Sequence, residues 1–279
     1  MKIKDWVSQW MGDEQPKEVD GTDSTQLKEA QWRKAGYSPI HETSEDDIFL
    51  VGYPKSGNTW MQNLVAGLMY RINTEYLPDR LTQILVPNLH GFEYYKRIQT
   101  PMVFKSHFLP QPEYRRVVYL VRDGRDALVS YYHMLRAEEE QISYHQMVND
   151  GLGVFPCKWH QHVSQWNSNP FAADILWVRY EDLLSDPMKE LKRFCEFCRL
   201  DRSTSDIQDC IAGNSFEKMK DKEKKFGWNN SEWNPEKSFI RGGRVGDYVA
   251  ELPADVIQSF ERQSGNELEL FGYKICQHV

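Results

Sequence analysis

Cationic and hydroxyl side chains gather where the apolar runs of this sequence end. Four runs typical of buried strands cover residues 47–53, 101–105, 116–121 and 174–180. The cationic or hydroxyl residues at or just after their ends are Lys55, Ser56, Thr59, Lys105, Ser106, Arg122, Arg125 and Arg179. Ammonium, guanidinium and hydroxyl groups are the side chains that hold phosphate-like anions. This clustering predicts a site for a highly anionic ligand.

His107 stands at the end of the second run, two residues after Lys105. A neutral imidazole can accept a proton from an attacking hydroxyl or amine, and a histidine pKa of about 6.5 suits that role. A single histidine in a sequence is more often structural than catalytic. The position of His107 among the predicted anion-binding residues makes it the candidate base.

The first run leads directly into a polar turn and then into an amphipathic run, which predicts a strand, a loop and a helix. The turn reads Tyr53-Pro-Lys-Ser-Gly-Asn-Thr-Trp60. Gly57 allows a close approach of the backbone to an anion, and a helix N-terminus favours negative charge. The Walker pattern is not met, because Lys55 precedes the glycine. Taken alone, the turn is compatible both with anion binding and with an ordinary structural turn.

Other chemistries find less support in the sequence. No His, Cys or Asp set has convincing metal-ligand spacing, and we expect no metal. Asp123, at the end of the third run, could hold Mg²⁺ in a P-loop kinase, but that alternative needs a Gly-Lys-Ser/Thr loop. Five cysteines lie scattered along the chain, and Cys195 and Cys198 fall within a helical pattern. We interpret them as reduced structural thiols.

The elements that must position these residues alternate between apolar runs and helical patterns. Helices are predicted over 126–136, 155–166 and 253–271, and Asp186-Pro187 has the form of a helix start. Short runs rich in Val and Ile that alternate with helices are typical of a buried parallel sheet. The fold class is therefore α/β, with a single P-loop-like domain and a central parallel sheet of four to five strands flanked by helices. In such sheets, ligands bind outside the carboxyl ends of the strands.

Composition narrows the classes of protein and partner. The 279 residues are 40% hydrophobic and 27% charged, with a formal net charge of −7. An acidic balance argues against nucleic acid or an anionic membrane as a general partner. The sequence has no apolar run of about 20 residues and no secretory signal, so we expect a cytoplasmic protein. We divide it into an N-terminal arm, 1–46, packed on the body, and one domain, 47–279.

Several motifs, taken in order, resemble those of the cytosolic sulfotransferase family over nearly the whole chain. Residues 53–60 resemble its 5′-phosphosulfate loop, and Phe104-Lys-Ser-His107 resembles its catalytic-histidine segment. Residues 118–133 resemble its 3′-phosphate segment. The remaining motifs in family order are Trp159-His-Gln-His-Val163, Tyr180-Glu-Asp182 and Arg241-Gly-Gly243.

The resemblance implies sulfuryl transfer from 3′-phosphoadenosine 5′-phosphosulfate (PAPS), with the desulfated nucleotide PAP as product, to a hydroxyl or amine of a small-molecule acceptor. It implies that His107 is the base and that Lys55 and Lys105 stabilise the transferring group. The residues implied in donor binding are Lys55, Ser56, Gly57, Asn58, Thr59, Trp60, Arg122, Ser130, Tyr180, Ser215, Phe216, Arg241, Gly242 and Gly243. The alternatives are the P-loop kinase and a nucleotide-binding module that has lost transfer activity.

The acceptor side is less defined. Aromatic residues that could form its walls are Phe92, Tyr95, Phe108, Tyr132 and Phe155. The charge run 217–225 is by default a solvated, mobile segment, but it falls where the family has a lid over the cofactor. Gly242 stands where the family often has Lys, and the family's C-terminal dimer motif is not visible. A monomer and a homodimer both remain open.

Overall fold

The computed structural model of this protein describes residues 22–138, 141–227, 240 and 242–275. Arg241 lies outside the described residues, as does much of the predicted arm. The helices are α2 (Thr22–Lys34), α3 (Asn58–Tyr70), α4 (Asp79–Leu85), α5 (Gly124–Ala137), α6 (Trp159–Ser168), α7 (Tyr180–Ser185), α8 (Pro187–Cys198), α9 (Thr204–Gly213), α10 (Phe216–Phe226), α11 (Tyr248–Glu251) and α12 (Ala254–Leu270). A 3₁₀ turn, η1, covers Thr74–Tyr76, and a π-helical turn, η2, covers Gln146–Asp150.

The central sheet is parallel and confirms the predicted fold class. Its four strands are β2 (Ile48–Gly52), β4 (Val103–Ser106), β5 (Arg116–Val121) and β6 (Asp174–Arg179), in the spatial order β4-β2-β5-β6. All three strand pairs are parallel. The four carboxyl ends therefore meet at one edge of the sheet, as the sequence predicts.

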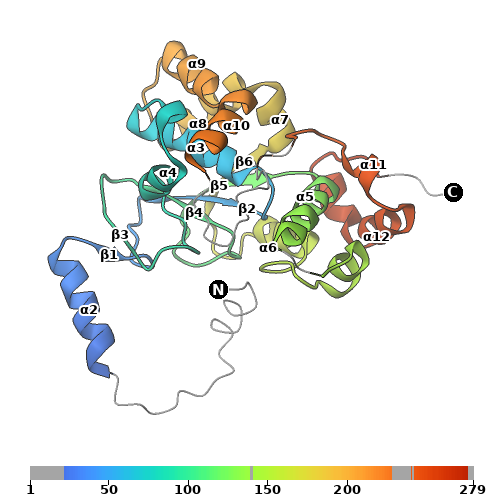
Figure 1. Ribbon diagram of the computed structural model, residues 1–279, viewed down its shortest axis with the longest axis horizontal. Helices are drawn as coiled ribbons and strands as arrows, with labels where there is room; N and C mark the ends of the chain where they lie inside the picture. The colour runs from blue at the N-terminus through green and yellow to red at the C-terminus, as the bar shows by residue number, and fades with distance from the viewer. Residues whose placement is uncertain (1–21, 139–140, 228–239, 241, 276–279) are drawn as a thin grey trace.

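Helices cover both faces of this sheet (Figure 1). Alternate residues of β2 point to opposite faces, so Ile48 and Leu50 join one core while Phe49 and Val51 join the other. The first core is completed by α3, α8 and α9, and the second by α5, α6 and α12. Burial on both faces explains why the strands are continuous apolar runs.

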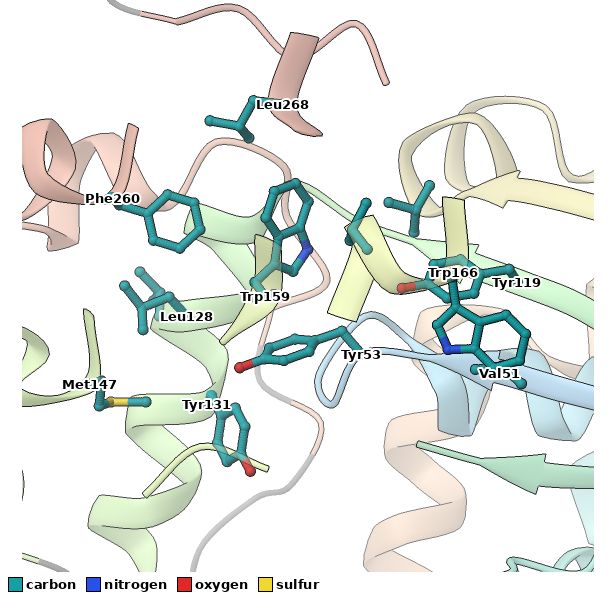
Figure 2. Packing of buried hydrophobic residues seen from close by; sticks show 14 of the residues in the cluster. Val51, Tyr53, Tyr119, Leu128, Tyr131, Met147, Trp159, Trp166, Phe260 and Leu268 are labelled. Carbon is teal, nitrogen blue, oxygen red and sulfur yellow. The ribbon is translucent and has the colours of Figure 1, made fainter. Parts of the chain in front are cut away.

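Aromatic residues dominate the second core (Figure 2). Tyr53, the first residue after β2, is buried and meets Tyr131 of α5 edge-on, with ring centroids 6.1 Å apart. Trp159 at the start of α6 packs on Phe260 of α12, with centroids 5.9 Å apart. This packing fixes the end of β2 against two helices, and so fixes the loop that follows.

The described part of the N-terminal arm joins the body through a second, smaller sheet. β1 (Ser38–Pro39) pairs antiparallel with β3 (Tyr94–Tyr95). Trp32 of α2 stacks on Tyr94, with ring centroids 5.7 Å apart. The sequence did not predict this pairing, because two-residue strands leave no periodic pattern.

Two predicted elements differ from the structure. The helix expected over 155–166 begins only at Trp159, since Pro156 disfavours a helical conformation in the residue before it. The charge run 217–225, by default a solvated segment, forms most of α10 and docks on the body. Met219 and Lys222 are buried, and Lys222 Nζ donates hydrogen bonds to Asn63 Oδ1 and to the carbonyl of Thr74.

No helix among the described residues is both long enough and apolar enough to span a membrane.

Candidate active site at the carboxyl edge of the sheet

The anion loop, residues 53–57, is a tight turn between β2 and α3. Lys55 and Gly57 have positive φ angles of 68° and 94°. A Cβ on Gly57 would lie 2.6 Å from Tyr180 Cδ2, so no other residue fits there without movement. The loop ends at the N-terminus of a 13-residue helix, where backbone N–H groups favour an anion.

Two polar side chains of the loop are buried with different partners. Asn58 Nδ2 donates to the carbonyl of Tyr53 at 2.8 Å, which closes the loop. This side-chain bond is structural, and the prediction that Asn58 donates to the 5′-phosphate then rests on its backbone N–H. The Ser56 side chain is fully buried, and its Oγ has no hydrogen-bond partner within the described residues. An unpaired buried hydroxyl in an anion loop fits a site that is completed by a phosphate oxygen.

Strand register brings His107 to this loop. β2 and β4 pair with Val51 opposite Ser106, so the next residues along each strand, Gly52 and His107, face each other. His107 Nδ1 lies 2.6 Å from the carbonyl oxygen of Gly52. A carbonyl can only accept, so Nδ1 carries the proton and Nε2 has the lone pair. That is the tautomer a general base requires.

The electrostatics of the site keep His107 neutral. Its pKa is lowered well below 6.5, first by burial and then by the positive charge of Lys105. Burial also lowers the pKa of Lys105 to about 8. Within the described residues the Lys105 ammonium makes no hydrogen bond and no ion pair. A partly buried cation in this condition is a site for an anion, whose binding would restore the charged form.

Two further histidines hold His107, and the sequence analysis did not assign either of them this role. His90 Nε2 accepts the backbone N–H of His107 at 2.6 Å, and the two rings stack with centroids 5.2 Å apart. On the other side, His162 Nε2 lies 3.1 Å from the carbonyl oxygen of His107. His162 is fully buried, and its Nδ1 meets the hydroxyl of Tyr119 at 2.7 Å. These contacts span 17 and 55 residues, so no local pattern could have signalled them.

A second region, the glycine segment of residues 242–247, is connected to the loop. The guanidinium of Arg122 connects the two: NH1 donates to the carbonyl of Lys55 at 3.1 Å and NH2 to that of Arg244 at 3.0 Å. Arg122 also lies over the ring of Tyr180, at 4.6 Å from its centroid. Its buried Nε has no hydrogen-bond partner among the described residues. Arg122 and Tyr180 thus both contact the anion loop and the glycine segment.

Side-chain bonds from α5 and α7 hold the glycine segment in place. Asp126 Oδ2 accepts the N–H of Gly246 at 2.7 Å, and Oδ1 accepts that of Tyr248 at 3.0 Å. The Tyr180 hydroxyl donates to the carbonyl of Gly243 at 3.1 Å. Burial raises the pKa of the Asp126 carboxyl, while these two N–H groups lower it. These bonds hold the segment at Gly243 and Gly246.

The residues predicted around the adenosine fall into two groups. Trp60 lies edge-on to Tyr180, with centroids 6.0 Å apart, and its indole N–H donates to the carbonyl of Asn214 at 2.9 Å. Ser215 caps α10, and Phe216 beside it is 40% exposed and within van der Waals reach of Gly243. An aromatic surface is therefore available near the glycine segment. Thr59 and Ser130 are half-buried in the first turn of α3 and in α5.

The predicted acceptor walls are only partly brought together. Phe108 and Phe155 lie 6.1 Å apart and both contact the ring of His90, at 4.0 and 5.5 Å between centroids. The remaining three are Phe92, which is half-buried, Tyr132, which packs on Tyr144 with centroids 3.9 Å apart, and Tyr95. Tyr95 is a core residue: it is buried against Phe104, and its hydroxyl donates to the carbonyl of Glu42.

Asp123, the candidate Mg²⁺ ligand of the kinase alternative, has another role. Both of its carboxylate oxygens accept hydrogen bonds from the buried guanidinium of Arg125, at 3.0 and 2.7 Å. Oδ1 also accepts the backbone N–H of Arg125, which caps α5. No cluster of three or more His, Cys, Asp or Glu residues able to hold a metal occurs within the ranges that the structure describes.

The parallel sheet, the anion loop and the neutral imidazole of His107 near the positive charge of Lys105 are the features of a P-loop-like group-transfer enzyme. The sequence profile of the sulfotransferase domain matches residues 45–272. This protein therefore belongs to the sulfotransferase family, and its chemistry is sulfuryl transfer. The resemblance of the sequence motifs to those of cytosolic sulfotransferases is thus confirmed.

Individual relatives agree with this assignment. Sulfotransferase 1E1 of Rattus norvegicus is 26% identical over 243 residues, which cover 77% of this chain and 81% of the relative. Sulfotransferase 1C2 of Homo sapiens is 24% identical over 290 residues, covering 94% and 96%. Among solved structures, retinol dehydratase in a complex with retinol and PAP superposes with a TM-score of 0.65 at 20% identity, covering 88% of this chain and 86% of that one. The likeness to that structure supports the fold.

Proposed function

We propose that this sulfotransferase uses PAPS as donor and a small molecule with a hydroxyl or amine as acceptor, with His107 as general base. The observation that carries the proposal is the 2.6 Å contact between His107 Nδ1 and the Gly52 carbonyl. It leaves Nε2 as an acceptor beside Lys105 and the anion loop. The proposal is supported by a solved structure of a mouse sulfotransferase in a complex with PAP, which is 21% identical to this chain.

The donor, when bound, supplies a sulfuryl group and a phosphate leaving group. The anion loop supports binding of the 5′-phosphate, through Ser56 Oγ and the backbone N–H groups around Gly57. Arg122 and the glycine segment support binding of the 3′-phosphate, to which Arg241 would add a second guanidinium by family resemblance. Unpaired donors at both places, Ser56 Oγ and Arg122 Nε, fit a ligand with two phosphates.

In the proposed reaction, a bond forms between the acceptor oxygen or nitrogen and sulfur while the bond from sulfur to the 5′-phosphate oxygen breaks. His107 Nε2 takes the proton that the acceptor loses. Lys55 and Lys105 stabilise the negative charge that grows on the leaving phosphate oxygen. Positioning and charge stabilisation are the main catalytic means for transfers of this kind. The aromatic surface of Phe108 and Phe155 favours an acceptor with an apolar body.

The test of the base is the variant His107→Ala. We expect kcat to fall by about 10²- to 10⁴-fold, the usual contribution of a general base. The affinity for PAP, measured by calorimetry, should stay within about twofold, since His107 is not among the residues proposed to hold the nucleotide. His145→Ala is the matched control, because His145 is an exposed histidine paired with Asp255. Loss of PAP binding in His107→Ala would mean that His107 is structural.

We also propose a domain division, a location and an oligomeric state. The domain division at residues 46 and 47 is supported by a profile match that begins at residue 45. A cytoplasmic location is supported by a relative from Danio rerio named cytosolic sulfotransferase 1. The protein acts as a monomer or a homodimer.

A further inference from the structure

His90 contacts both the backbone and the ring of His107. Its Nε2 accepts the His107 N–H at 2.6 Å, and its ring stacks on the His107 imidazole at an interplanar angle of 24°. Gly52 and His162 reach His107 from other directions, through the ring Nδ1 and the carbonyl. Three separate contacts therefore define where the remaining ring atom, Nε2, points.

The position of His90 is itself fixed by the strand that carries the site. The N–H of Lys105 donates to the carbonyl of Pro87 at 2.8 Å, and the N–H of Leu89 donates to the carbonyl of Lys105 at 2.9 Å. Residues 87–89 thus extend the sheet beside β4, with a parallel bridge between Asn88 and Lys105. His90 follows directly, so its ring moves with the strand that ends before His107.

The chemistry of His90 suits a fixed hydrogen-bond acceptor. Accepting at Nε2 requires the neutral ring with its proton on Nδ1. Burial and the charge of Lys105 lower the pKa of His90 to about 3, so the ring stays neutral across the working range of an enzyme. The ring of His90 also contacts the rings of Phe108 and Phe155. His90 therefore stands between the candidate base and the aromatic surface proposed for the acceptor.

We propose that His90 is a positioning residue for sulfuryl transfer: it aims His107 Nε2 at the acceptor by accepting the His107 N–H and covering one face of its ring. This inference rests on the proposed role of His107 as general base. Replacement of His90 should therefore lower the rate of sulfuryl transfer without weakening donor binding or preventing folding.

Two variants separate the hydrogen bond from the stacking. His90→Phe keeps an aromatic ring but has no acceptor, whereas His90→Gln offers an amide oxygen near the place of Nε2. We expect kcat to fall about 10- to 100-fold in His90→Phe, since small displacements of a catalytic group are costly. His90→Gln should recover at least part of the loss. The PAP dissociation constant should stay within about twofold of wild type in both.

The outcomes distinguish this inference from the proposed function. Wild type and His107→Ala are assayed in parallel with PAPS and a panel of phenols, alcohols and amines. A His90→Phe protein that binds PAP and keeps kcat within about twofold of wild type, while His107→Ala is inactive, overturns the role of His90 and leaves the proposed function standing. An active His107→Ala overturns both.

If His90→Phe fails to fold, a comparison of kcat between His90→Gln and His90→Asn tests the proposal. The shorter Asn amide does not reach the His107 N–H, so its kcat is expected to lie about tenfold below that of the Gln variant. Equal kcat values in these two variants would overturn the proposal.

Discussion

The two regions proposed to bind the phosphates of the donor, the anion loop and the glycine segment, are built in different ways. The anion loop continues directly from a buried strand, and its shape is set by backbone geometry and close packing on Tyr180. The glycine segment has no strand or helix of its own, and its shape is set by bonds from Asp126, Arg122 and Tyr180 to its backbone. One region is held by the core and the other by a few polar side chains, so they should differ in their tolerance of substitution.

Glycine substitutions in the two regions should show the largest difference. An alanine at Gly57 meets both a φ of 94° and a Cβ position 2.6 Å from Tyr180, so the loop has to move. At Gly246 the φ of 85° is equally unfavourable, but nothing lies within 4 Å of the added Cβ. We expect Gly57→Ala to lower kcat/KM for PAPS by roughly 100-fold or more, as a shift of about 1 Å can do. Gly246→Ala should cost about 1 kcal/mol of stability from backbone strain alone.

Steady-state kinetics and thermal unfolding on both variants measure this contrast. Equal losses of activity would show that the two regions are not held differently.

Removing the Asp126 carboxylate should loosen only the glycine segment. Asp126→Ala deletes the acceptor of the Gly246 and Tyr248 N–H groups, and two buried hydrogen bonds of this kind contribute about 1–3 kcal/mol. Hydrogen exchange at these two amides should speed up by about tenfold or more, because local opening becomes easier. Amides in the first core, such as those of α3, should keep their protection. Unchanged exchange at Gly246 would mean that other contacts hold the segment.

The pH dependence of kcat/KM for PAPS should distinguish the two regions, with a smaller effect than that of the substitutions above. Guanidinium groups in general keep their charge across the working range of an enzyme. Lys105 has a pKa of about 8, because burial disfavours its charged form, and it therefore loses charge as pH rises above that value. We expect kcat/KM for PAPS to fall roughly fourfold by pH 8.5. The acid limb should lie below pH 6.5, since His107 stays neutral until its lowered pKa is reached.

Lys105→Arg is the control for this limb. A guanidinium keeps its charge, so the decline near pH 8 should disappear in this variant even if its absolute rate is lower. Persistence of the same alkaline limb would assign it to another group. In wild type, the limb in kcat should lie at higher pH than the limb in kcat/KM, since a bound anion favours the charged lysine.

The sequence was sufficient for the sheet and for the edge where the site lies. Each of the four central strands lies within or close to a predicted apolar run, because burial on both faces leaves a continuous signal. The start of α8 was also predictable, since Asp186 accepts the N–H of Lys189 and Pro187 follows it. These features depend on neighbouring residues, which a single sequence displays.

The parts that the sequence did not reveal depend on distant contacts. Neither His90 nor His162 gives a local sign in the sequence that it contacts His107. Asn58 was predicted to bind phosphate from its place in the motif, but whether its amide turns inward to Tyr53 is decided by the loop conformation. Tyr95 shows the same ambiguity among aromatic residues, which serve equally well as core and as pocket wall.

The burial of Lys222 gives α10 a natural chemical reporter. The helix carries five lysines, at 218, 220, 222, 224 and 225, and Lys222 is buried while Lys224 and Lys225 are exposed. A brief pulse of an amine-acylating reagent would mark the exposed lysines first and reach Lys222 only when the helix leaves the body. The rate of acylation at Lys222, measured by peptide mass spectrometry, would then report how often α10 opens. A slower rate in the presence of added nucleotide would show that the ligand stabilises the docked helix.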